Sequence, residues 1–262
     1  MADSQTIDSN QILTSPHRLN EQHHTTTKIL GFLIHPKILH HLPTNHPFKM
    51  ADIACGTGIF LLDLSTSHLL PPETQYIGYD ISPSIFPSNP PSNITFKTHD
   101  MFLPFPESEL NIRFVSNSTP LNEWISTVQN LVSLLKPGAC QEIYSALEPF
   151  RVAKENPVIG LMIREGNTRI DREKLWREKV KGLVHVHEDV FSTDRLCETE
   201  IREKGTRNII KCFLGCLRVL IGEDEGWTEE RVKRLEEEAM REIDEGVYHT
   251  PDQVCIVGMK GL

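Results

Sequence analysis

A glycine turn between a predicted strand and a predicted helix constrains this chain more than any other feature. Lys49–Cys55 is mostly apolar, Gly56-Thr57-Gly58 follows it, and Ile59–Ser67 has the apolar content of a helix. Glycine permits a sharp turn and lets a ligand approach the backbone with no Cβ in the way. The turn opens onto a helix N-terminus, whose unpaired N–H groups point toward a ligand.

Further segments continue this alternation of strands and helices. Gln75–Asp80 and Ile94–Thr98 are predicted strands, and Leu121–Leu135 is a predicted helix that stops at Lys136-Pro137-Gly138. Strands that alternate with helices predict a parallel sheet with right-handed crossovers. We therefore expect an α/β, Rossmann-like, doubly wound and mostly parallel sheet.

An acid at the end of the second strand indicates the class of ligand. Asp80 lies 22 residues after Gly58, and in doubly wound folds such an acid accepts hydrogen bonds from ribose hydroxyls. The dinucleotide fingerprint G-x-G-x-x-G/A is broken, because Leu61 stands at its third small position. A nucleoside ligand is therefore expected, and a glycine turn that serves only helix packing is the alternative.

The turn Asp52-Ile-Ala-Cys-Gly-Thr-Gly58 resembles motif I of the class I S-adenosylmethionine-dependent methyltransferases. Other segments extend the resemblance over most of the chain: Arg18–His23 and Gly31–Pro36 resemble the N-terminal helices of fungal secondary-metabolism methyltransferases, Tyr76–Ser82 their second motif, His99–Met101 with Pro104–Pro106 the third, and Leu131–Gly138 the helix and turn before strand five. The resemblance implies S-adenosyl-L-methionine as cofactor and methyl transfer to a small-molecule acceptor.

The same resemblance implies a role for each matching residue. The methionine and ribose parts of the cofactor would be held by Asp52, Ala54, Cys55, Gly56, Thr57 and Gly58, with Asp80 on both ribose hydroxyls. The adenine would meet Ile81, Asp100, Met101 and Phe102, with Asp100 accepting from its amino group and Met101 offering a backbone N–H. A loop acid that caps a nearby turn is the alternative interpretation of Asp100.

Two segments depart from the family pattern. Glu109–Ser116 keeps only the final part of the usual fourth strand, and Ala139–Ser145 is short and polar where the family has an apolar fifth strand. Central parallel strands are normally near-continuous apolar runs, so we expect a widened pocket and lower stability. An imperfect gene model, a natural variant with altered chemistry and a compensated active enzyme all remain open.

Two other functions compete with methyl transfer. A non-methylating relative, such as a cyclase, a pericyclase or a binding partner, would keep the fold and lose the reaction. A nicotinamide-dependent reductase would need a small residue at Leu61 and a tyrosine with a lysine four residues later, which neither Tyr144 nor Tyr248 has.

The sequence does not identify a catalytic residue. A hydroxyl acceptor benefits from a histidine or carboxylate base, and the weak candidates are His23 and its neighbour His24, on a helix that could act as a lid, and His99. The group His40, His41 and His46 lacks a carboxylate or cysteine at ligand spacing. We interpret that group as a surface loop and expect no metal.

The domain organisation follows from these assignments. We expect a disordered tail over residues 1–16 and a single methyltransferase-like domain over 17–262, in which 17–47 form a helical lid broken at Gly31 and Pro36, 48–150 a cofactor-binding core, and 151–262 helices and the final strands. Gly182–His187 predicts a half-exposed strand, Trp227–Gly246 a charged helix, and Val254–Val257 a final antiparallel strand at the sheet edge.

Composition narrows the partners and the compartment. The net charge of −9 disfavours nucleic acid as a partner. No stretch approaches the ~18 apolar residues of a membrane helix. Six scattered cysteines and a polar N-terminus without a secretory signal predict a cytoplasmic protein with reduced thiols. The oligomeric state is not predicted.

Overall fold

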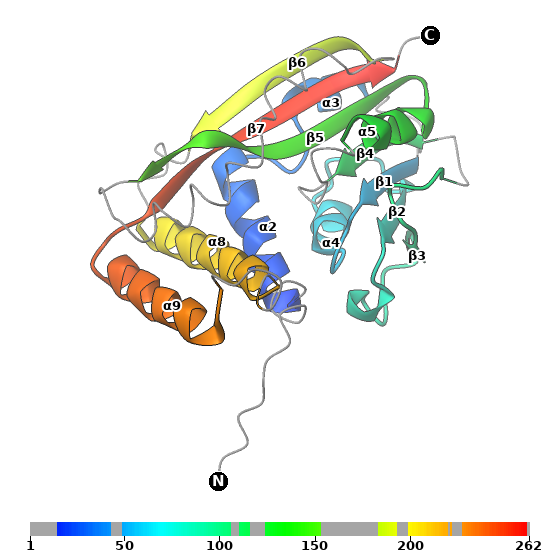
Figure 1. Ribbon diagram of the computed structural model, residues 1–262. Helices are drawn as coiled ribbons and strands as arrows, with labels where there is room; N and C mark the ends of the chain where they lie inside the picture. Colours follow the sequence, from blue (N-terminus) through cyan, green and yellow to red (C-terminus); the bar gives the residue numbers. More distant parts are fainter. Residues whose placement is uncertain are drawn as a thin grey trace. The chain divides into compact units, whose positions relative to one another are not determined.

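The computed structural model describes residues 15–42, 49–105, 110–115, 124–152, 183–192, 199–219, 221 and 227–260 (Figure 1). Residues 1–14 of the expected tail and His46 of the expected loop lie outside the described residues. The chain forms two compact units. The sheet unit comprises Thr27–Leu147, Ile170–Phe191 and Asp252–Leu262, and the helical unit comprises Met1–Thr26, Glu148–Arg169 and Ser192–Pro251.

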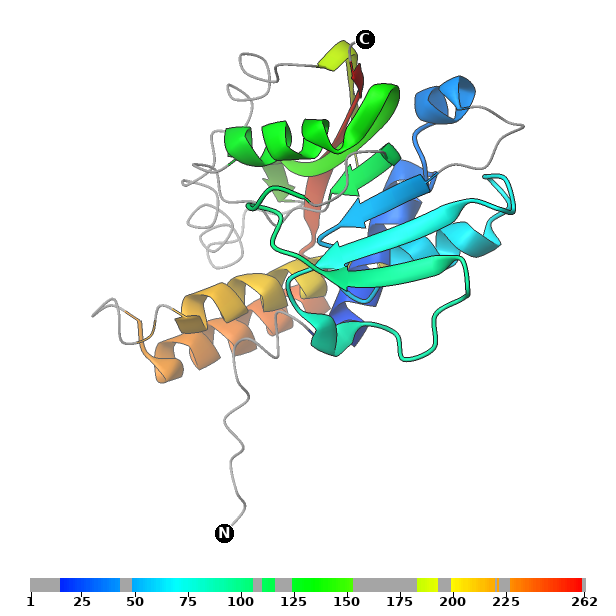
Figure 2. The ribbon, with the colours of Figure 1, turned by 90° about the vertical axis from the view of Figure 1, so that its right-hand side faces the viewer.

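A seven-stranded sheet has the order β3-β2-β1-β4-β5-β7-β6. Its strands are β1 (Lys49–Ile53), β2 (Gln75–Asp80), β3 (Ile94–Thr98), β4 (Leu110–Val115), β5 (Leu135–Val152), β6 (Leu183–Ser192) and β7 (His249–Lys260). The β1–β2, β1–β4, β2–β3 and β4–β5 pairs are all parallel, and Figure 2 shows the arrows of β1, β2 and β3 pointing the same way. The predicted α/β, Rossmann-like sheet is therefore confirmed. The strand order reverses between β1 and β4, which makes their carboxyl ends the expected ligand edge.

The fourth and fifth strands are both present, and the fifth is longer than the short strand expected from sequence. β4 has six residues and lies between β1 and β5, with Met50 opposite Ile112 and Asp52 opposite Phe114. β5 has 18 residues and begins at Leu135, so the expected helix stop and the supposedly short strand both lie inside it. The pairing shifts between Leu110, which is opposite Leu135, and Ile112, which is opposite Cys140. This irregularity accommodates Pro137, which has no N–H to give to a ladder.

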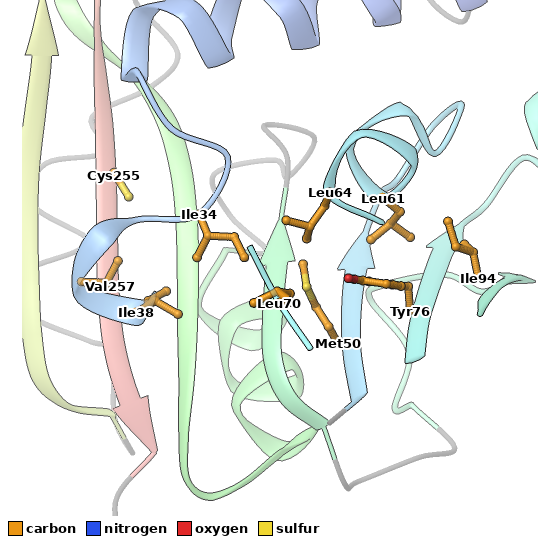
Figure 3. Close-up of a cluster of buried hydrophobic side chains, with 10 residues drawn as sticks. All are labelled: Ile34, Ile38, Met50, Leu61, Leu64, Leu70, Tyr76, Ile94, Cys255 and Val257. Carbon is orange, nitrogen blue, oxygen red and sulfur yellow. The ribbon is translucent and has the colours of Figure 1, made fainter. Parts of the chain in front are cut away.

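The final strand was predicted at the sheet edge, and that placement is wrong. β7 lies between β5 and β6, so the edge strands are β3 and β6. Figure 3 shows the arrows of β6 and β7 pointing in opposite directions. Cys255 and Val257 of β7 are buried, whereas Val190 of β6 is 53% exposed, which explains why β6 takes the outer position.

Helices cover the strands of the sheet unit. They are α3 (Pro36–His41), α4 (Ile59–Thr66), the short 3-10 helix η1 (Pro83–Ile85) and α5 (Trp124–Ser133). The preceding helix α2 (Pro16–Leu30) ends at Gly31, whose φ is 83°, so the predicted break in the N-terminal helices is confirmed. His40 and His41 end α3 and do not form the loop expected there.

One hydrophobic cluster joins distant segments of the sheet unit (Figure 3). Ile34 and Ile38 from the N-terminal segment pack with Met50 of β1, Leu61 of α4 and Val257 of β7. The cluster therefore fixes β1, and with it the start of the glycine turn, from both ends of the chain.

The helical unit is built around α8 (Thr199–Val219) and α9 (Glu229–Asp244). Ile210 and Leu214 of α8 pack with Val232, Ala239 and Ile243 of α9. The helix predicted over Trp227–Gly246 is thus confirmed, with Thr228 as its N-cap. Among the described residues, no helix combines the length and apolar character needed to cross a bilayer.

Candidate functional site

The glycine turn leaves β1 through three residues in the left-handed region. Ala54, Gly56 and Gly58 have φ values of 58°, 55° and 72°. Gly58 is the N-cap residue of α4, so the turn delivers the chain to the N-terminus of that helix. The Cys55 N–H donates to the Tyr79 carbonyl oxygen at 3.0 Å, which ties the turn to β2. The structure therefore brings Asp52–Gly58 together as one compact bend.

Asp80 points at this bend. Its Oδ2 accepts the Gly56 N–H at 2.7 Å and its Oδ1 accepts the Ser82 N–H at 2.9 Å. A carboxylate has about four lone-pair sites, so each oxygen retains capacity for a ligand hydroxyl. Asp80 is thus placed to hold the bend, its own loop and a pair of hydroxyls at once.

Phe96 of β3 packs against the bend at Gly58. This residue was not identified from the sequence. A Cβ on Gly58 would lie 2.3 Å from Cζ of Phe96, and a Cβ on Gly78 would lie 2.6 Å from its Cδ1. The ring therefore fills the space that the two glycines leave empty. Phe86 also stacks on it, with ring centroids 5.2 Å apart, and so links the loop after β2 to the bend.

Asp52 is buried in β1, between Gly78 of β2 and Phe114 of β4 in the sheet register. Burial raises the pKa of Asp52 well above its ordinary value, and the charge of Asp80 raises it further. A cation bound beside Asp52 would favour its charged form and so lower this pKa. Burial also raises the pKa of the Cys55 thiol, with smaller contributions from Asp52 and Asp80, which disfavours the thiolate form of this cysteine.

The loops after β2 and β3 both present exposed apolar side chains. Phe102 and Leu103 are 37% and 56% exposed, and Ile81 is 69% exposed. Oδ1 of Asp100 accepts the Phe102 N–H at 2.9 Å, which is the turn-capping contact given as the alternative interpretation of this acid. That contact uses one of its two carboxylate oxygens. Met101 lies within the same turn.

The catalytic candidates have different surroundings. His99 donates its backbone N–H to the Asp80 carbonyl oxygen at 2.9 Å, and its ring lies 4.3 Å from the ring of Phe105. Its Nε2 lies 3.4 Å from the Leu103 carbonyl oxygen, so the imidazole holds the loop after β3. His23 belongs to the helical unit, where its ring lies 5.4 Å from that of His24.

A buried histidine, His35, was not anticipated from the sequence. His35 lies just before α3, where its Nδ1 accepts the Lys37 N–H at 3.1 Å, and its Nε2 lies 2.7 Å from Oδ2 of Asp189. His187 contacts the other oxygen of Asp189 at 2.9 Å. Burial lowers the pKa of His35, although the hydrogen bond to Asp189 opposes this. The position directly before Pro36 is a helix-start signal that could have identified His35 as an N-cap.

Curated relatives are fungal methyltransferases. No family model matches the chain. The methyltransferase grgD of a Penicillium species is 25% identical over 268 residues, which cover 93% of this chain and 92% of grgD. The N-methyltransferase sirN of Leptosphaeria maculans is 33% identical over 132 residues, which cover 48% of this chain and 44% of sirN. The N-methyltransferase verN of Clonostachys rogersoniana is 24% identical over 145 residues, which cover 52% of this chain and 50% of verN.

Solved structures show the same fold. The phosphoethanolamine N-methyltransferase 2 of Haemonchus contortus in complex with S-adenosyl-L-methionine has a TM-score of 0.56 at 12% identity, over 99% of this chain and 59% of that one. Its complex with phosphomonomethylethanolamine and S-adenosylhomocysteine has a TM-score of 0.55 at 13% identity, over 99% and 60% of the two chains. The chain is therefore a relative of the fungal methyltransferases, and it has the Rossmann-like fold of the class I S-adenosylmethionine-dependent methyltransferases.

Proposed function

We propose that this chain transfers a methyl group from S-adenosyl-L-methionine to a small-molecule acceptor. The observation that carries the proposal is the pair formed by Asp80 and the Gly56 N–H, at 2.7 Å, at the carboxyl end of β2. A carboxylate fixed against a glycine bend at a helix N-terminus suits the two hydroxyls of a ribose.

The charges at the bend favour a cationic nucleoside over a phosphorylated one. Asp52 and Asp80 are both acids, and Asp52–Gly58 contains no lysine or arginine. A pyrophosphate would meet two carboxyl groups there, whereas the ammonium and sulfonium of S-adenosyl-L-methionine would be attracted. The exposed apolar side chains of Ile81 and Phe102 suit the faces of an adenine ring.

In this proposal the chain contributes alignment. When bound, the cofactor supplies a methyl group on a positively charged sulfur, and the transfer is an in-line displacement. Asp80 and the bend hold the sugar, Asp52 orients the ammonium end, and the loops after β2 and β3 hold the base. His99 serves to position the loop after β3, because its ring contacts Leu103 and Phe105.

The non-methylating alternative is not favoured. Its motivation was that strands four and five look truncated in the sequence, whereas both form strands of the sheet, β4 with six residues and β5 with 18. The three curated relatives all carry methyltransferase names. Two of those names specify N-methylation, so amines are the first acceptors to test.

Calorimetry with S-adenosylhomocysteine tests the cofactor. Wild type should bind it, and Asp80→Asn should weaken binding by about tenfold or more, because hydrogen bonds to a charged group contribute ~1.5–3 kcal/mol. Glu73→Gln makes the same chemical change at an exposed position and should leave binding unchanged. Failure of the wild type to bind at millimolar concentration would overturn the proposal.

Methyl transfer is then tested with cofactor that carries a labelled methyl group. Separate pools of amines, hydroxyl compounds and thiols give the acceptor class. Label in a product that disappears with Asp80→Asn supports transfer by this site. Binding without transfer to any pool would instead revive the non-methylating alternative.

A further inference from the structure

We propose that Asn130 of α5 is a positioning residue that sets the preference of the cofactor site for adenine over hypoxanthine. The inference rests on the proposed function, because it concerns the base end of the same site. Its starting point is a hydrogen bond: the side-chain Nδ2 of Asn130 donates to the Phe102 carbonyl oxygen at 3.0 Å.

Hydrogen bonds within the turn itself also hold it. The Phe102 N–H donates to Oδ1 of Asp100 at 2.9 Å, and the Leu103 N–H donates to the Asp100 carbonyl oxygen at 3.0 Å. The contact from His99 to Leu103 is longer, at 3.4 Å. Asn130 lies 28 positions away in sequence and joins this turn to a separate element.

The helix gives Asn130 a fixed base. The next two residues, Leu131 and Val132, are buried, and Leu134 is completely buried after the helix ends. A side chain on such an anchored helix can hold the Phe102 carbonyl, and with it the peptide unit that joins Phe102 to Leu103, in one orientation. The N–H of that unit closes the turn on the Asp100 carbonyl oxygen, and the closed turn presents the Phe102 N–H to Oδ1 of Asp100. The Asn130 contact therefore fixes the turn that positions the Asp100 carboxylate.

Recognition of the base depends on the position of the Asp100 carboxylate. With Oδ1 capping the turn, Oδ2 is the oxygen available to accept the amino group of adenine. Hypoxanthine presents a carbonyl oxygen at the same position, and two acceptors repel each other. A site that hydrogen-bonds a donor rejects an analogue without it, but only when the acceptor is held in place.

The test compares two ligands on two matched variants. Asn130→Asp replaces the donating amide by a carboxylate that faces the Phe102 carbonyl, and Gln129→Glu makes the same change one residue earlier at an exposed position. Calorimetry gives the Kd of S-adenosylhomocysteine and of S-inosylhomocysteine for each protein. Wild type and Gln129→Glu should prefer the adenine ligand equally, and Asn130→Asp should lose about tenfold of that preference, the effect of one hydrogen bond.

A merely structural role predicts a different result. If Asn130 only stabilised the fold, both affinities would fall by the same factor and the preference would stay at its wild-type value, which overturns the inference. Asn130→Ala, which removes the side-chain donor without adding charge, should also lower the preference, and it replaces Asn130→Asp if that variant does not fold. Wild type that binds neither ligand refutes the proposed function itself, whereas a wild-type preference kept by both Asn130 variants refutes only the role of Asn130.

Discussion

The ring of Phe96 occupies the space that a side chain on Gly78 would need: a Cβ there would lie 2.6 Å from Cδ1 of Phe96 and 2.9 Å from Sγ of Cys55. Both neighbours belong to elements that also shape the bend, β3 and the turn after β1. Close packing behind the bend therefore depends on the absence of a side chain at this position of β2.

Gly78→Ala should lower the free energy of unfolding by ~1–3 kcal/mol, the usual effect of overpacking a filled core. Phe96→Leu removes the ring, so the alanine should be less harmful in the double variant than in wild type. Gly205→Ala in α8 is the control. The new Cβ would lie 3.4 Å from Cγ2 of Thr25, and alanine should stabilise the helix slightly relative to glycine. Urea unfolding of wild type, Gly78→Ala, Phe96→Leu and the double variant measures the coupling. Additive effects of Gly78→Ala and Phe96→Leu would contradict the packing described here.

Ala54→Gly should stabilise the protein. Ala54 has a φ of 58°, a conformation that strains a residue with a Cβ by roughly 1 kcal/mol and that glycine adopts readily. Ala51→Gly is a matched control in the preceding strand β1, where the residue is fully buried and the change should destabilise. Thermal unfolding should therefore move the two midpoints in opposite directions. A lower midpoint for Ala54→Gly would show that the alanine methyl group contributes packing that outweighs the strain.

Cofactor binding should release protons from Asp52. Burial and the charge of Asp80 raise the pKa of Asp52 in the free protein, and a bound ammonium would lower it. Calorimetry with S-adenosylhomocysteine in buffers of different ionisation enthalpy gives the number of protons released. Asp52→Asn should abolish the release, and Asp63→Asn on α4 should leave it intact. Release that persists in Asp52→Asn would locate the titrating group elsewhere.

The contact between His35 and Asp189 should make stability fall on the acid side of neutrality. The pKa of His35 is lowered by burial, so the unfolded chain takes up its proton first as pH falls through the ordinary value of 6.5. Protonated His35 also loses the Nδ1 lone pair that accepts the Lys37 N–H. The pKa of Asp189 is lowered as well, because its hydrogen bonds from His35 and His187 outweigh burial, and a second loss follows below pH 3.8.

Urea unfolding at pH 7.5 and pH 5.5 measures the first of these losses. His35→Asn keeps a side-chain oxygen for the helix start and removes the titrating ring, so it should show a smaller difference between the two pH values than wild type. His40→Asn, on α3, should keep the wild-type difference. An unchanged difference in His35→Asn would exclude this histidine as its source.

Local sequence was sufficient to predict the glycine turn and the position of Asp80 beside it. Asp80 could be placed beside Gly56 because both follow adjacent parallel strands, whose carboxyl ends meet at one edge of the sheet. The break at Gly31 and the helix after Thr228 were also predicted from local sequence, because helix caps and helix breaks depend on only a few neighbouring residues.

Pairings between distant segments were not predictable in this way. The polar composition of Ala139–Ser145 gave no indication of the full length of β5, which depends on its partner strands. Nothing within Val254–Val257 specifies which two strands lie on either side of it. Phe96 and Asn130 act on glycines and on a carbonyl oxygen supplied by other elements. Such contacts depend on tertiary packing and have no local signature.

β7 lies between β5 and β6 in the sheet, although it is the last of these strands to be synthesised. When β6 leaves the ribosome, the strand that must lie beside it has not been translated, because α8 and α9 come first. Until residues 249–260 emerge, β6 carries an unpaired row of backbone groups that can recruit another nascent chain. A chain cut after residue 248 should consequently leave β6 open to protease, and completion of the sheet becomes a late event of folding.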